Sequence, residues 1–139
     1  MIAKIAVSAA VYAIDKPYSY AVPPGMTLLP GVRVMVPFGR GNRNVEGVVL
    51  SLEEGNEAEL KCVDRALDPE PVLDDAMLRL AAFVRERYFC TFYEAIRAVL
   101  PVGLWYQVQD TFTLASGRPW EGKTIRQKDA KAVLAFLED

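Results

Sequence analysis

The side chains best suited to chemistry in this sequence are aromatic and cationic, and they fall close together in the chain. They are Tyr18, Ser19, Tyr20, Arg33, Arg40 and Arg43. Aromatic rings stack on the bases of single-stranded nucleic acid, and neighbouring cations attract its phosphates. Side chains alternate along a strand, so Tyr18 and Tyr20 share one face, and either both line a site or both are buried. The combination predicts a surface for single-stranded nucleic acid.

The segment around these side chains has the pattern of a small β-barrel. Alternating runs cover residues 18–22, 32–36 and 45–52, and the turns that follow the first two are rich in Gly and Pro. Such runs and turns predict short strands. An apolar run at the N-terminus predicts a buried strand, and residues 60–67 predict the last strand. We therefore expect five or six strands within residues 2–67, folded as a small OB-like barrel.

Helical periodicity replaces the strand pattern after the last predicted strand. Apolar residues recur at helical spacing between 75 and 88, preceded by Asp74, a residue type that caps helix N-termini. Thr91 and Glu94 have the spacing of a capping box, which predicts a second helix that Pro101 ends. We expect the two helices to pack over an open end of the barrel, which makes the fold class mainly β with α.

These segments, taken in order, resemble the N-terminal region of the PriA family of bacterial replication-restart DNA helicases. The matching motifs are Tyr18-x-Tyr20-x-x-Pro23-x-Gly25, Gly31-x-Arg33-Val34-x-Val36-Pro37-Phe38-Gly39, Gly47-x-Val49, Leu60-Lys61-x-Val63, Asp68-x-Glu70-Pro71, and Tyr88 leading to Leu100-Pro101. The resemblance covers residues 2–105 well and the rest loosely. No single motif is diagnostic of the family, and the resemblance is specific because all of these motifs occur in the same order.

The resemblance implies a domain that binds the 3′ end of the nascent leading strand at a stalled fork. The implied pocket comprises Tyr18, Ser19, Tyr20, Phe38, Gly39 and Lys61, with Arg40 and Arg43 following the DNA backbone. An aromatic face would stack the terminal base, Gly39 would admit the sugar, and Lys61 would contact the last phosphate or the terminal ribose. Many family members carry an acid where this chain has Ser19, whose hydroxyl forms weaker hydrogen bonds but repels phosphate less.

The resemblance also implies the partners and the cofactor requirement. We expect binding to single-stranded or forked DNA with a free 3′ end, and contacts with single-stranded-DNA-binding protein and other primosome proteins. ATP, Mg²⁺ and a structural Zn²⁺ would belong to helicase domains absent from these 139 residues, so we expect no cofactor here. The expected location is the bacterial cytoplasm, at the nucleoid.

Residues 105–139 resemble the start of the winged-helix domain that follows the barrel in the family, which leaves residues 1–104 as the DNA-binding domain. Residues 107–114 alternate as one strand, and apolar residues within 125–137 mark one face of a final helix. An exposed apolar stripe tends to find a partner. We therefore expect this helix to pack on its own barrel, pair with a second copy, or exchange between copies.

Residues 117–124 match the phosphate-loop pattern G-x-x-x-x-G-K-[ST], which makes a nucleotide-binding fragment the third hypothesis. That loop works by directing successive backbone N–H groups at phosphate oxygens. Pro119 has no N–H, and Trp120 is bulky where the chain must curl. The residues after Thr124 are also too few for the strands and the magnesium-binding Asp that the fold needs. We expect no nucleotide binding at this loop.

The composition argues against catalysis and against a metal site. The sequence contains no histidine, and Cys62 and Cys90 lack metal-ligand spacing. We expect both thiols to be buried and reduced. Without histidine the common nucleophile pairs are missing, so we expect no catalytic residue, although carboxylate or lysine chemistry stays open. No apolar run reaches the ~18 residues of a membrane helix.

Charge is divided sharply along the chain, although the formal net charge is only −2. Residues 16–45 carry four cations and no acid, a net charge of +4, whereas residues 46–75 carry a net charge of −8. The basic stretch can hold one end of a strand, but this average charge does not suit coating of duplex DNA. The alternative function is therefore a protein-interaction barrel with an acidic docking face at residues 46–75.

Overall fold

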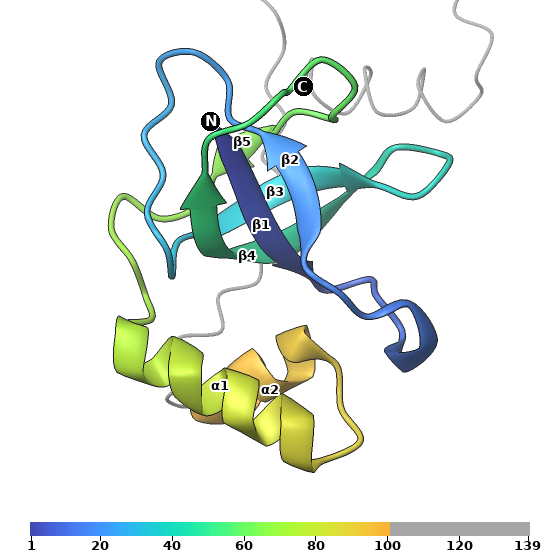
Figure 1. Ribbon diagram of the computed structural model, residues 1–139, viewed down its shortest axis with the longest axis vertical. Helices are drawn as coiled ribbons and strands as arrows, with labels where there is room; N and C mark the ends of the chain where they lie inside the picture. Colours follow the sequence, from blue (N-terminus) through green and yellow to red (C-terminus); the bar gives the residue numbers. More distant parts are fainter. Residues whose placement is uncertain (101–139) are drawn as a thin grey trace, which may run out of the picture. The chain divides into compact units, whose positions relative to one another are not determined.

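The computed structural model describes residues 1–100, which form a β-sheet followed by two helices (Figure 1). The elements are β1 (Ile2–Val7), the 3-10 helix η1 (Tyr12–Ile14), β2 (Tyr18–Ala21), β3 (Arg33–Phe38), β4 (Arg43–Glu53), β5 (Arg65–Ala66), α1 (Asp75–Arg87) and α2 (Phe92–Val99). The predicted winged-helix start at 105–139, the loop at 117–124 and the final helix lie outside the described residues. The predicted fold class, mainly β with two packed helices, is confirmed.

The sheet has five antiparallel strands in the order β2-β1-β4-β3-β5. The long β4 pairs with β1 on one side and with β3 on the other. Gly47 lies at this crossing, where a Cβ atom would come within 2.5 Å of the Ile5 side chain. The absence of that atom allows β1 to approach β4 closely. The strand expected at residues 60–67 is shorter than predicted, because only Arg65 and Ala66 join the ladder.

The two edges of the sheet approach each other without forming a continuous ladder. Ala21 of β2 makes an isolated parallel bridge to Cys62, which precedes β5. The Ala21 amide donates to the Lys61 carbonyl at 2.9 Å, and the Val63 amide donates to the Ala21 carbonyl at 3.0 Å. The sheet is therefore OB-like but not a closed barrel. Cys62 is exposed and Cys90 is partly exposed, so the expectation of buried thiols was wrong.

The apolar core lies inside the curled sheet, as the two-residue alternation predicts. Side chains from β1, β2, β3 and β4 and from the segments between the strands fill it. Its buried members are Ala3, Ile5, Val7, Ala10, Tyr20, Leu28, Val32, Val34, Val36, Val49 and Val63. β-Branched residues dominate this set, and they pack well on a pleated surface.

The two helices begin where their capping residues predict. The Asp74 side chain accepts a hydrogen bond from the Met77 amide at 2.8 Å, which satisfies one free N–H of α1. Thr91 and Glu94 form the predicted capping box at the start of α2. The helices lie together at one end of the sheet (Figure 1), and α2 contacts β1.

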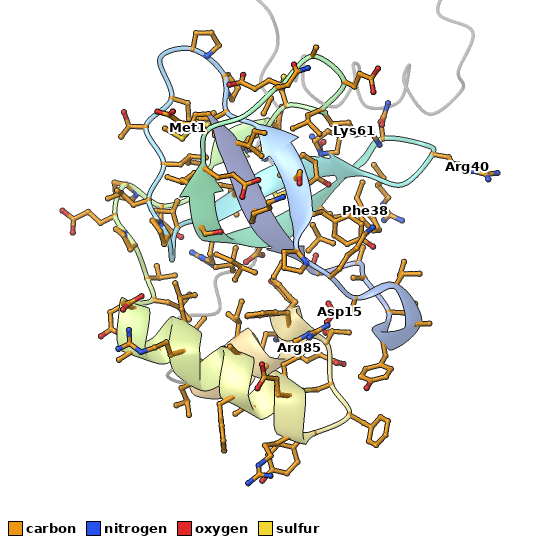
Figure 2. All side chains as sticks on the ribbon, in the orientation of Figure 1. Met1, Asp15, Phe38, Arg40, Lys61 and Arg85 are labelled. Carbon is orange, nitrogen blue, oxygen red and sulfur yellow. The ribbon has the colours of Figure 1, made fainter. Side chains whose placement is uncertain are left out.

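Two ion pairs with largely buried carboxylates hold the segments between the elements in place. The carboxylate of Asp15, whose side chain is 2% exposed, accepts from Arg85 Nε of α1 at 2.7 Å and from the Phe92 amide of α2 at 3.0 Å (Figure 2). The side chain of Arg33 in β3 holds Asp68 through two hydrogen bonds, at 2.9 and 2.7 Å, and its backbone amide donates a third at 3.2 Å. Losing one partner of such a pair would leave an uncompensated buried charge.

Gly31 should be the glycine least tolerant of substitution. It has a φ of +88°, and a Cβ atom there would lie 1.9 Å from the Leu73 carbonyl oxygen, where the segment leading to α1 docks on the sheet. Gly25 is the matched control, with a φ of +86° and nothing within 4 Å of a Cβ atom. Both Ala substitutions carry the left-handed penalty of about 1–2 kcal/mol. We predict that Gly31→Ala lowers the free energy of unfolding by about 1–3 kcal/mol more than Gly25→Ala, measured by urea denaturation. Equal losses would contradict the docking contact.

Candidate nucleic-acid interface

A pocket of about 690 Å³ opens where β2, the end of β3 and the segment before β5 meet. It is lined by Tyr18, Ser19, Tyr20, Phe38, Gly39, Arg40, Asn42 and Lys61. All six residues predicted for the 3′-end pocket are thus brought together, along with Arg40. Figure 2 shows Phe38 and Lys61 on the side of the sheet from which the β3–β4 hairpin projects, with Arg40 on that hairpin.

An aromatic wall forms one side of the pocket. The rings of Tyr18 and Phe38 meet edge to face, with centroids 5.1 Å apart, and both are partly exposed. The Tyr18 hydroxyl donates to the Ile14 carbonyl at 2.6 Å, which fixes the outer end of its ring. Because the ring is held at both ends, little side-chain entropy remains to be lost when a planar ligand stacks on it.

Tyr20 lines the pocket from below and belongs to the core. It is 3% exposed, and its hydroxyl donates to the Pro37 carbonyl at 3.1 Å. Burial, followed by the neighbouring Tyr18, raises the pKa of Tyr20 to about 12. Strand alternation places both tyrosines on one face, as expected. The expectation that both line a site or both are buried was too simple. Tyr18 lines the pocket from its edge, and Tyr20 does so while buried.

Lys61 lies next to β2 and reaches across to the turn after β3. Its Nζ donates to the Gly39 carbonyl at 2.7 Å, in a contact that is exposed to solvent. Gly39 has a φ of +71° and no atom within 4 Å of where a Cβ would stand, so its backbone is open to a ligand. Lys61 lines the pocket without being buried. Because its hydrogen bond to the Gly39 carbonyl is exposed to water, a ligand can replace that carbonyl as the acceptor at small cost in free energy.

The polar residue between the two tyrosines has a cationic partner that the sequence analysis missed. Lys4 of β1 donates from Nζ to Ser19 Oγ at 2.8 Å, and it also pairs with Glu53 at 2.9 Å. Since the lysine uses a lone pair of Oγ, the serine hydroxyl proton is left to donate to a ligand. Lys4 is found only through the strand register, which pairs it with Ser19.

The predicted cations have separate roles in the structure. Arg40 is exposed and lines the pocket, whereas Arg43 is exposed in β4 opposite Phe38 and does not line it. Arg33 is buried against Asp68, whose hydrogen bonds raise the pKa of the guanidinium. Its inclusion among the cations for nucleic acid was therefore wrong. Asn42 lines the pocket without having been predicted.

Residues 1–100 contain neither a metal-binding cluster nor a membrane-spanning helix. No group of three or more His, Cys, Asp or Glu side chains in this part of the chain is arranged to hold a metal ion. Within the same residues no helix is long and apolar enough to cross a membrane.

The fold and the pocket define an OB-like domain with an aromatic and cationic pocket at the meeting of its sheet edges. A model of the 3′DNA-binding domain (3′BD) of PriA matches residues 4–101, and the chain belongs to this family. Membership points to a non-catalytic DNA-binding region.

Curated relatives agree with this assignment. The chain is 28% identical over 120 residues to the replication restart protein PriA of Bacillus subtilis, covering 83% of this chain and 15% of that protein. It is 34% identical over 110 residues to the probable replication restart protein PriA of Mycobacterium tuberculosis, covering 76% and 16%. The chain thus spans about a sixth of the length of these relatives.

Alkaline pH should reveal the burial of Tyr20. Its pKa is about 12 in the folded chain, against 10.0 for a free tyrosine. The protonated phenol therefore contributes stability fully below about pH 10, and this contribution is lost as the pH rises to about 12, where the unfolded chain ionises first. Burial raises the pKa of Tyr93 in the same direction. We predict that the free energy of unfolding falls less steeply above pH 10 in Tyr20→Phe than in wild type, measured by urea denaturation. An unchanged slope would contradict the burial.

Proposed function

We propose that this chain binds the 3′-hydroxyl end of a nascent DNA strand at stalled replication forks, as the N-terminal part of a replication-restart helicase. The observation that carries the proposal is the pocket that joins the Tyr18–Phe38 wall to Lys61 at Gly39. Membership in the family of PriA 3′DNA-binding domains supports it.

Each wall of the pocket has a role in this proposal. The terminal base stacks on the exposed part of the Tyr18–Phe38 pair, worth roughly 1–3 kcal/mol and independent of the base. The deoxyribose lies against Gly39, where no Cβ intervenes. Lys61 exchanges the Gly39 carbonyl for the last phosphate or the terminal ribose. Tyr20 lines the pocket while buried, and in this proposal the pocket admits a strand terminus and excludes a continuous strand.

Ser19 contributes as a donor, unlike the acid common in the family. Because Lys4 donates to its oxygen, the hydroxyl proton is directed to the ligand, and an oxygen of the terminal nucleotide accepts it. Lys4 is itself paired with Glu53, so it orients the serine without adding a net charge to the site. End binding in this chain thus relies on neutral and cationic donors.

The alternative, an acidic docking face, has less support. The acids of residues 46–75 do not gather as free charges, because most of them have partners within the domain. The partnered acids are Glu46 and Asp68 with Arg33, Glu53 with Lys4, Glu57 with the N-terminus, Asp64 with Arg65, Asp75 with Arg79, and Asp74 at the start of α1. Charge reversal at Asp68 would therefore disturb the fold, whereas reversal at exposed Glu57, Asp64 or Asp75 would test a partner.

The proposed setting follows from the family. The chain works without a cofactor or metal of its own, and any ATP-driven helicase activity belongs to other domains of the whole protein. It acts in the bacterial cytoplasm on single-stranded or forked DNA, beside single-stranded-DNA-binding protein and other primosome proteins. A homodimer or exchange through the predicted helix at 125–137 remains part of the proposal.

End selectivity is the first test. We predict that the chain binds a 3′-hydroxyl oligonucleotide more tightly than the same strand with a 3′-phosphate, because the phosphate adds bulk where the pocket closes. The four terminal bases should differ little, and the salt dependence should be shallow because few phosphates are engaged. Fluorescence anisotropy with 5′-labelled strands measures each affinity. Equal affinity for hydroxyl-ended, phosphate-ended and circular strands would contradict the pocket.

Substitutions at the pocket provide the second test. Lys61→Ala removes an exposed side chain, so it should weaken binding of the 3′-hydroxyl strand without changing the unfolding midpoint. Tyr18→Ala should weaken binding by about 10-fold, the range expected for loss of one stacked ring. Arg87→Ala, an exposed cation on α1 outside the pocket, is the matched control and should bind as wild type. Equal effects of Lys61→Ala and Arg87→Ala would show a general charge effect.

A further inference from the structure

A second hollow lies directly beside the proposed end pocket. It has a volume of about 410 Å³ and is lined by Ala13, Ile14, Asp15, Lys16 and Tyr18. Tyr18 lines both this hollow and the end pocket, so its ring is the wall that separates them. A ligand that stacks on Tyr18 in the first space can therefore continue past the edge of the ring into the second.

The second hollow has the charge that a phosphate needs. Lys16 Nζ lies 5.5 Å from the centroid of the Tyr18 ring, beside the wall common to both spaces. The nearest acid in sequence, Asp15, has a side chain only 2% exposed, and its carboxylate is neutralised by Arg85. Residues 16–45 contain no other acid to oppose a phosphate. Lys16 has no acidic partner among residues 1–100.

The opposite side of the end pocket is less favourable for a DNA backbone. Beyond Lys61 the chain presents Asp64, whose side chain is 41% exposed, and Glu57, whose side chain is 39% exposed. Asp64 is paired with Arg65 and Glu57 with the N-terminus, so these groups offer a phosphate no net positive charge. The more favourable path for a strand that enters the pocket is therefore towards Lys16.

We propose that the nucleotide preceding the 3′-terminal one occupies the hollow at Ala13–Lys16, with Lys16 contacting the phosphate between the two nucleotides and Lys61 contacting the terminal ribose. The proposal rests on the end-binding function above and adds the path of the strand. It assigns Tyr18 to both nucleotides, as the stacking surface for the terminal base and the wall of the second subsite. The η1 segment, fixed by Asp15 to α1 and α2, is held in place for this contact.

The test compares thymidine with the dinucleotide d(TpT), each with a 3′-hydroxyl, in NMR titrations of the whole chain. Wild type should bind d(TpT) more tightly, and only d(TpT) should shift the amide signals of Ala13 and Ile14. Lys16→Ala should reduce d(TpT) affinity roughly two- to fivefold, as expected for one exposed ion pair, and leave thymidine affinity unchanged. The affinity for d(TpT) should also depend less on salt concentration in Lys16→Ala than in wild type, because the substitution removes one screened ion pair.

The controls separate this inference from the proposed function. Arg40→Ala tests the other exit along the β3–β4 hairpin, and Arg87→Ala tests a general charge effect. If Lys61→Ala weakens both ligands but Lys16→Ala weakens neither, the end pocket stands and the second subsite is overturned. Equal weakening of both ligands by Lys16→Ala overturns the subsite too, because Lys16 would then act only through the Tyr18 ring. If Lys61→Ala and Tyr18→Ala affect neither ligand, both proposals fail.

Discussion

The site depends on two backbone hydrogen bonds that join the edges of the sheet, between Ala21 and the Lys61–Val63 segment. The strand order places β2 and β5 at opposite edges, so only the curl of the sheet brings these residues together. That closure delivers Lys61 to the tyrosines of β2, although the two lie far apart in sequence. The aromatic wall and the cation thus belong to one pocket because the sheet folds back on itself.

The second constraint is the separation of buried from exposed cations. Arg33 is 4% exposed and is bound by Asp68, so it supports the fold, whereas Lys61, Arg40 and Lys16 are exposed around the cavities. The acids that follow in sequence are used mainly in ion pairs and helix caps. A chain with a net charge of −2 therefore still presents a local surface suited to one end of a DNA strand.

Local sequence patterns predicted most of the fold, because strand alternation, turns and helix caps depend on residues that are close together in the chain. Alternation and Gly/Pro turns located the strands, and Asp74 and Thr91 located both helix starts. Contacts between residues far apart in the chain could not be predicted from such patterns. Nothing local distinguishes buried Arg33 from exposed Arg40, and the role of Lys4 depends on its register with Ser19. The family resemblance assembled the residues of the pocket, and the Lys16 hollow was found only from the structure.

The central claim is that one strand terminus occupies the pocket formed by Tyr18, Phe38, Gly39 and Lys61. The most direct measurement is a set of intermolecular nuclear Overhauser effects in a complex with a short 3′-hydroxyl strand carrying an isotope label in a single nucleotide. We predict contacts from the 3′-terminal nucleotide to the rings of Tyr18 and Phe38, and none from a nucleotide in the middle of the strand. Contacts to these rings from the middle nucleotide as strong as those from the terminal one would contradict it.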